Sequence, residues 1–179
     1  MLNFDELFIF AKACGFTHAG ALDVSTLEFL SEVRNMCASD KCRNYNRSWS
    51  CPPATGALEA MRERASKFKS GIIVQTVGAI EDSYDFEAMQ ETAKKQSDNF
   101  QRLWDKLEPL YPSLFPMGSG GCVKCEKCTY PDEPCRFPDR LMSSMEACGL
   151  LVSRVCIANG MKYNHGPDTI AYTGCFLLE

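Results

Sequence analysis

The chain opens with apolar residues at helical spacing. These residues recur every three or four positions and share one helix face: Phe4, Leu7, Phe8 and Ala11. Asn3 precedes this face, Glu6 follows three positions later in a capping-box spacing, and Gly15 is a natural C-terminal stop. The pattern therefore predicts a helix over residues 3–14. The alternation in "FTHAGALDV" then predicts a short strand.

The rest of the chain divides into further helices and strands. Ser25 and Thr55 are candidate N-caps, and Pro138 is a candidate first helical residue. The predicted helices cover residues 25–35, 55–69, 83–108, 138–148 and 150–159. The predicted strands are "SGIIVQTVGAI" at 70–80 and "TIAYTGCFLLE" at 169–179.

This order of elements predicts an α+β or α/β fold, with a small mixed sheet flanked by helices. No repeat or linker divides the sequence, and 179 residues suffice for one domain, so we expect a single domain over residues 1–179. Two cysteine-rich segments, residues 37–53 and 118–138, contain prolines, asparagines or glycines and are expected to form metal-binding loops at one edge.

Composition narrows the class of protein. The first residues carry Asp5 and Glu6 where a signal peptide has positive charge, and no apolar run is long enough to cross a bilayer, so we expect a cytoplasmic protein without a membrane partner. A net charge of −4 favours no nucleic-acid partner. In a reducing cytoplasm, eleven cysteines, an odd number, indicate metal ligands rather than a disulfide framework.

The downstream cysteines have the more informative spacing. Cys122, Cys125 and Cys128 form C-x2-C-x2-C, and Cys135 follows as a candidate fourth ligand. Three thiols in tandem are typical of 4Fe–4S loops, whereas zinc usually takes two separated pairs. The spacing favours an iron–sulfur cluster and leaves zinc, or structural and redox thiols, as alternatives.

The upstream cysteines are more loosely spaced. Cys37, Cys42 and Cys51 either hold a second cluster or supply Cys51 to the first. Three thiols without a fourth would leave one iron open to act as a Lewis acid. The alternative is a fourth ligand from elsewhere in the fold, for which the candidates are Cys148, Cys156, Cys175 and His165.

Other chemistry-bearing residues have simpler interpretations. Cys14, Cys148, Cys156 and Cys175 fall within helix or strand patterns and are expected to pack in the core. His18 lies in a strand-like stretch and is expected to be structural. Four basic residues flank the cysteines and either offset thiolate charge or form a docking patch: Arg43, Arg47, Lys124 and Lys127.

With both cysteine segments considered, the chain resembles a family of small prokaryotic predicted metal-binding proteins, domain of unknown function 2284. The matching stretches are "CRNYNRSWSCPPA", "GGCVKCEKCTYPDEPCRFPDR" and "SSMEACGLLV". The resemblance implies metal ligation by these residues: Cys37, Cys42, Cys51, Cys122, Cys125, Cys128 and Cys135. A shorter stretch, "AKACGFTHAGALDV", is similar to the N-terminus of iron–sulfur reductases of the epoxyqueuosine reductase type.

These observations predict an iron–sulfur protein with one or two 4Fe–4S clusters. We expect it to pass electrons between a reductant and a redox partner protein or a small-molecule substrate. One alternative is an iron–sulfur oxidoreductase or related enzyme (a reductase, desulfidase or lyase) that binds substrate at an open iron. The other is a zinc-stabilised binding module.

Overall fold

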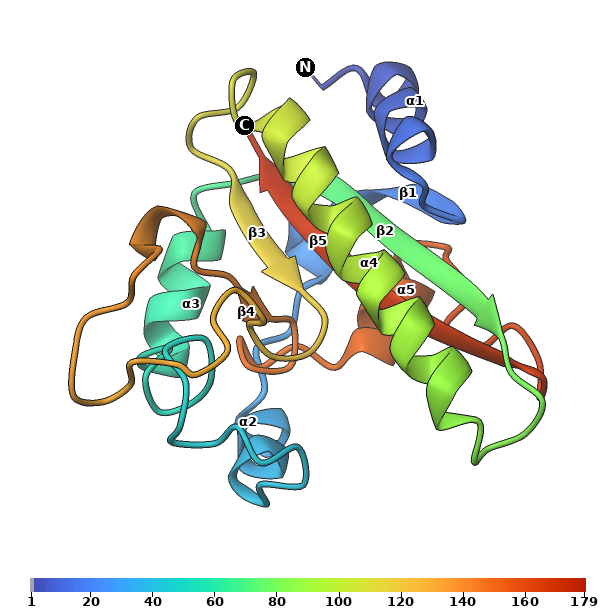
Figure 1. The fold of residues 1–179 in the computed structure, drawn as a ribbon. Coiled ribbons are helices and arrows are strands. Elements are labelled where there is room, and N and C mark those ends of the chain that lie inside the picture. The colour runs from blue at the N-terminus through green and yellow to red at the C-terminus, as the bar shows by residue number, and fades with distance from the viewer. Residues whose placement is uncertain (1) are drawn as a thin grey trace.

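The computed structural model describes residues 2–179 and has a five-stranded sheet at its centre (Figure 1). The strands lie in the order β1 (His18–Asp23), β2 (Ser70–Ala79), β5 (Thr169–Leu178), β3 (Phe115–Gly118) and β4 (Ser143–Ser144). Neighbours are antiparallel except β3 and β4, which are parallel. The expectation of a mixed sheet flanked by helices is confirmed.

Helices cover both faces of the sheet, and each face has its own core. Residues of α1 (Phe4–Cys14) and α4 (Phe86–Leu107) pack with one set of strand side chains. Residues of α3 (Leu58–Ala65) and α5 (Val152–Ala158) pack with the other set. A further helix, α2 (Ser31–Ala38), contributes to neither core and leads into the upstream cysteines.

The central strands alternate between these two cores. Ile72 and Val74 point toward α1 and α4, whereas Ile73 points toward α3 and α5. In β5, Phe176 stacks on Phe100 of α4 with 4.1 Å between ring centroids. Strands β2 and β5 are therefore buried on both sides over part of their length, which explains the continuous apolar runs at residues 72–74 and 175–178.

The long periodic elements lie where the pattern predicts them. The Asn3 side chain accepts a hydrogen bond from the Glu6 backbone N–H at 3.3 Å. Gly15 ends α1 with φ +103°, a left-handed conformation that glycine adopts without a Cβ penalty. The predictions of β1, β2, α4, α5 and β5 are also confirmed to within a few residues.

The prediction of a helix over residues 25–35 is wrong at its start. The Asp23 side chain caps a 3-10 turn over Val24–Thr26 by accepting the Ser25 N–H, so Ser25 is not an N-cap. Phe29 then forms a β-bridge with Leu150, which holds the chain extended until α2 begins at Ser31. The tertiary pairing overrides the helical pattern.

Three other boundaries differ from expectation. The helix predicted from Thr55 begins at Leu58, after a turn, and ends at Ala65. The helix predicted over 138–148 is a 3-10 turn, Pro138–Arg140, followed by β4, because Ser144 pairs with Gly118 of β3. The upstream cysteine segment is not entirely loop, since Cys37 lies in the last turn of α2.

No helix within residues 2–179 is both long and apolar enough to cross a membrane.

Candidate metal centre

The two cysteine segments pack against each other although about eighty residues separate them along the chain. Figure 1 shows the segment between α2 and α3 beside the long loop that joins β3 to β4. The Trp49 indole N–H donates to the Glu133 carbonyl at 3.1 Å, and the Tyr130 hydroxyl lies 2.8 Å from Asn46 Oδ1. The Trp49 and Tyr130 rings meet edge to face with 4.9 Å between centroids. The segments thus form one unit, which we call the cysteine lobe.

Two buried serine hydroxyls connect the segments next to the sulfurs. Ser50 Oγ accepts the backbone N–H of Cys122 at 3.1 Å and lies 3.0 Å from Ser48 Oγ. The same hydroxyl is 3.7 Å from the Cys51 sulfur. Ser50 is 1% exposed and Cys122 is half-buried, so this hydrogen bond is partly shielded from water. The contact fixes the start of the downstream cysteine loop relative to Cys51.

The four downstream cysteines line a single cavity. This cavity has a volume of about 230 Å³ and includes Cys122, Cys125, Cys128 and Cys135 in its wall. The basic side chains in the wall outnumber the one acidic side chain, Glu126; they are Arg47, Lys124, Lys127 and Arg136. The sequence-predicted set of four thiols is therefore brought together around one volume in a positively charged surrounding.

Cys128 lies where a thiolate is stabilised. Burial alone would raise the pKa of its thiol, but hydrogen bonds outweigh burial and lower the pKa. The donors are the backbone N–H groups of Tyr130, Trp49 and Thr129 and the side chain of Ser48. Donors that converge on a sulfur favour its charged form, which is the form that binds metals.

Cys51 lies between the upstream and downstream groups. Burial raises the pKa of Cys51, and the neighbouring thiols of Cys42, Cys122 and Cys128 raise it further. Burial also raises the pKa of Cys37, and the nearby Glu146, Cys42 and Cys51 raise it further. The upstream thiols thus lie near one another, and Cys51 also lies near two downstream thiols, those of Cys122 and Cys128.

The four candidates for a further ligand lie in different surroundings. Cys148 is buried, and burial raises the pKa of its thiol to about 12; Cys37 is among its neighbours. Cys156 and Cys175 lie in the core beside the sheet. His165 stacks on His18 with 4.8 Å between ring centroids and contacts Gln75. Of the four, Cys148 is the one that neighbours an upstream thiol.

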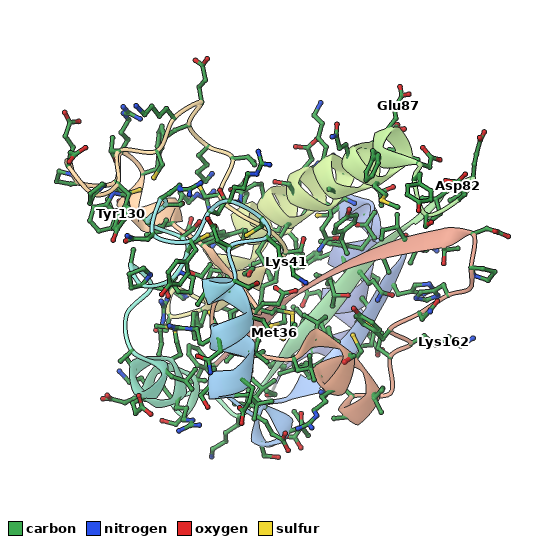
Figure 2. All side chains as sticks on the ribbon, turned by 90° about the horizontal axis from the view of Figure 1, so that it is seen from below. Met36, Lys41, Asp82, Glu87, Tyr130 and Lys162 are labelled. Carbon is green, nitrogen blue, oxygen red and sulfur yellow. The ribbon has the colours of Figure 1, made fainter. Side chains whose placement is uncertain are left out.

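The histidine pair lies apart from the cysteine lobe, because His18 belongs to β1 and His165 contacts Gln75 of β2. Tyr130 of the lobe and Lys162, whose charge acts on His18, appear on opposite sides of the molecule in Figure 2. His165 therefore belongs to another part of the surface than the cysteines.

The upstream loop has an unusual backbone. Asp40, Arg43 and Asn46 have φ values of 51°, 57° and 55°, in the left-handed region that residues with a side chain seldom adopt. Asp40 holds this conformation by accepting the Tyr45 N–H at 3.0 Å and by pairing with Arg47 at 3.1 Å. Such conformations concentrate at functional sites, and here three occur between Cys37 and Cys51.

The downstream cysteines do not form a ready-made site for one metal ion. Within residues 2–179, no three His, Cys, Asp or Glu side chains are close enough together to hold a single metal ion. What the four downstream cysteines share is the wall of one cavity, which we call the cysteine cavity.

The structure adds residues to the candidate site that spacing did not reveal. The hydroxyls of Ser48 and Ser50, and the Trp49–Tyr130 contact, join the two segments. Their signal in the sequence is local: "SWSC" places two small hydroxyl residues beside a cysteine. The sequence pattern does not show which backbone N–H groups, far along the chain, donate to these hydroxyls.

Comparison with known proteins gives one match. No curated protein and no solved structure matches the chain. A family described as predicted metal-binding protein (DUF2284) matches residues 20–178, which include both cysteine segments. The chain therefore belongs to the DUF2284 family of predicted metal-binding proteins.

Proposed function

We propose that the cysteine lobe holds an iron–sulfur cluster of the 4Fe–4S type and that the protein has an electron-transfer or redox function. The observation that carries this proposal is the common cavity of Cys122, Cys125, Cys128 and Cys135. Membership of a metal-binding family supports the presence of a metal. The choice of iron–sulfur over zinc is our own and depends on the arrangement of the donors.

The donor set fits a cluster better than a single ion. Zinc places four ligand sulfurs about 2.3 Å from one point, so a zinc site needs thiols that converge. In a 4Fe–4S cluster each cysteine binds a different iron, so the thiols surround a volume. The four downstream cysteines lie in the wall of one volume of about 230 Å³, which supports the second arrangement.

The protein's own groups would set the properties of the centre. A 4Fe–4S cluster supplies one electron at a time, at a potential set by charge, hydrogen bonds to sulfur and exposure. The N–H donors around Cys128 reduce the negative charge felt at that sulfur. The Arg47, Lys127 and Arg136 side chains add positive charge around the cavity. All of these groups would favour the reduced, more negative state of a bound cluster.

The upstream thiols are a second candidate centre. Cys37, Cys42 and Cys51 neighbour one another, and Cys148 neighbours Cys37. A cluster with three thiolates and an open iron at this position would make the protein an enzyme, a reductase, desulfidase or lyase, rather than an electron carrier. The proximity of Cys51 to Cys122 and Cys128 favours instead a thiol that supports the downstream centre.

All eleven cysteines are free thiols, which suits a reducing compartment. We therefore place the proposed function in the cytoplasm, with a redox partner protein or a small molecule as the electron acceptor or donor.

Anaerobic purification followed by iron, sulfide and zinc analysis tests the proposal. We expect a brown protein with iron and acid-labile sulfide in equal amounts. An amount close to four irons per chain indicates one cluster, and twice that amount indicates two. A colourless protein with stoichiometric zinc would refute the cluster and support a zinc-stabilised binding module. Perturbation of the electron paramagnetic resonance spectrum by a small ligand would favour the enzyme with an open iron.

A further inference from the structure

A second, larger cavity lies next to the cysteine lobe, between α4 and the glycine-rich segment 119–124. It has a volume of about 600 Å³, which is within the range of small-molecule sites. Cys122 and Lys124 line both this cavity and the cysteine cavity. We call the larger one the α4 pocket.

The α4 pocket contains a buried amide without a partner. Gln96 of α4 lines the pocket and is 1% exposed. Neither the nitrogen nor the oxygen of its side-chain amide has a hydrogen-bond partner among residues 2–179. A buried amide that makes no hydrogen bond costs free energy, and natural proteins rarely retain one without a reason. An unpaired amide of this kind, on a residue in the wall of a cavity, points to a ligand.

The Gln96 side chain determines which groups of a ligand can pair with it. It offers an acceptor oxygen and a donor nitrogen side by side. A group that satisfies both atoms must itself present a donor next to an acceptor. Lactam edges of flavin and pyrimidine rings and the carboxamide of nicotinamide have this arrangement.

Apolar and aromatic side chains around Gln96 favour a flat ligand. Phe100 lies one helical turn beyond Gln96 on α4 and also lines the pocket. Met142 and the half-buried Tyr172 complete the wall. Rings and a flexible thioether provide contact area for a planar heterocycle.

Two lysines favour an anionic group on that ligand. Lys94 has no carboxylate partner among the described residues, and Lys124 donates only to the neutral Gln101 oxygen at 3.0 Å. Asp98 contributes one carboxylate to the same lining. Arg140 pairs with Asp105 and Glu108 outside the pocket and is already neutralised. Lysine commonly binds phosphate, to which it presents a point charge.

We propose that the α4 pocket binds a planar heterocycle of the nucleotide class, with Gln96 pairing to its lactam or carboxamide edge and with Lys94 and Lys124 pairing to its phosphate. This binding does not depend on the proposed function, because it uses only the side chains of the α4 pocket. The further statement that the ligand exchanges electrons with the protein rests on the proposed function, because it uses the position of Cys122 between the two cavities.

The test titrates the anaerobically purified full chain with three probes: flavin mononucleotide, uridine monophosphate and nicotinamide mononucleotide. Binding is measured by calorimetry. We expect at least one probe to bind with Kd below about 1 mM. Removing the phosphate, as in riboflavin for the flavin probe, should weaken binding about tenfold or more, since the charged contacts with Lys94 and Lys124 are lost.

Matched variants then assign the contacts. Gln96→Met keeps the length of the side chain and removes both polar atoms, and should weaken binding about tenfold or more. Lys94→Gln should weaken it by about three- to tenfold. Lys95→Gln is the control, because Lys95 has the same charge on the same helix but pairs with Glu91 at 3.0 Å and does not line the pocket. It should bind as the wild type does.

Two results overturn the proposal. One is that none of the three probes binds the wild-type protein. The other is that Gln96→Met and Lys94→Gln both bind like Lys95→Gln; the exposed Lys94 keeps this test valid even if the buried substitution disturbs folding. Metal and sulfide are measured on the same samples. A metal-loaded protein that binds no probe refutes the α4 pocket alone, and a cluster-free protein that binds one refutes the proposed function alone.

Discussion

Replacing Ser50 by alanine should loosen the joint between the two cysteine segments. Ser50 Oγ is the acceptor for the Cys122 N–H at 3.1 Å, and it also lies 3.0 Å from Ser48 Oγ. Alanine removes the hydroxyl but fits the same space. The substitution therefore deletes hydrogen bonds without creating a steric conflict.

The size of the effect follows from burial. Ser50 is 1% exposed, whereas Cys122 is half-buried, so the hydrogen bond between them is partly shielded from water. Losing a hydrogen bond of this kind costs about 0.5–1.5 kcal/mol. We expect the free energy of unfolding to fall by that amount, which corresponds to about a 2- to 13-fold change in the unfolding equilibrium.

The assay is urea unfolding of the metal-free chain, followed by the rate at which the loaded protein loses metal to a chelator. Ser66→Ala is the control, because the Ser66 hydroxyl also hydrogen-bonds the backbone, donating to the Glu63 carbonyl at 2.8 Å, but is exposed. This control should change stability by less than about 0.5 kcal/mol. Equal stabilities and equal metal-loss rates for Ser50→Ala and Ser66→Ala would refute the role of this hydroxyl in joining the segments.

Three further predictions concern other parts of the fold. Gln96→Met should raise the free energy of unfolding by about 1–3 kcal/mol in urea, because it removes a buried amide without partners; a loss of stability would contradict this assignment. Gly15→Ala should lower the melting temperature and cost about 1–3 kcal/mol, because φ is +103° and a Cβ would lie 2.7 Å from Asn99 Oδ1; an unchanged melting temperature would contradict the left-handed cap. Burial, then His165 and Lys162, lowers the pKa of His18, so below about pH 6.5 the unfolded chain binds more protons at this residue than the folded chain does. Stability should therefore fall as the pH decreases from about 6.5 through the lowered pKa, and His18→Gln should flatten this part of the stability curve, whereas an identical slope in both proteins would contradict the shift.

The sequence predicts the parts of the fold that local physics determines. Helix α1 and helix α4 have long apolar stripes, and the caps Asn3 and Asp85 accept the backbone N–H groups of their first turns. Strands β2 and β5 are apolar enough to identify as buried strands.

The missed elements depend on partners far along the chain. Ser144 has a helical neighbourhood in the sequence but pairs with Gly118, and Phe29 pairs with Leu150. Such pairings form between residues about 25 to 120 apart, and no local pattern shows them. Short strands such as β4, with two residues, offer no periodicity to detect.

The candidate site divides in the same way. Cysteine spacing identified the four thiols that share a cavity, because ligand spacing is a local property. The hydrogen bond from the Cys122 N–H to Ser50, the residue before Cys51, joins distant segments and became visible only in the structure. Gln96 had a weak signal: it lies four residues before Phe100 and seven before Leu103, on the apolar stripe of α4.

The most direct test of the central claim compares iron and acid-labile sulfide in the anaerobically purified wild type and in two cysteine variants. Cys128→Ala removes a thiol from the cysteine cavity, and Cys14→Ala removes a core thiol packed among α1 and α4. We expect iron and sulfide in equal amounts in the wild type and in Cys14→Ala, with a loss of at least half of both in Cys128→Ala. Stoichiometric zinc in place of iron, or an iron content that Cys128→Ala leaves unchanged, would contradict the account.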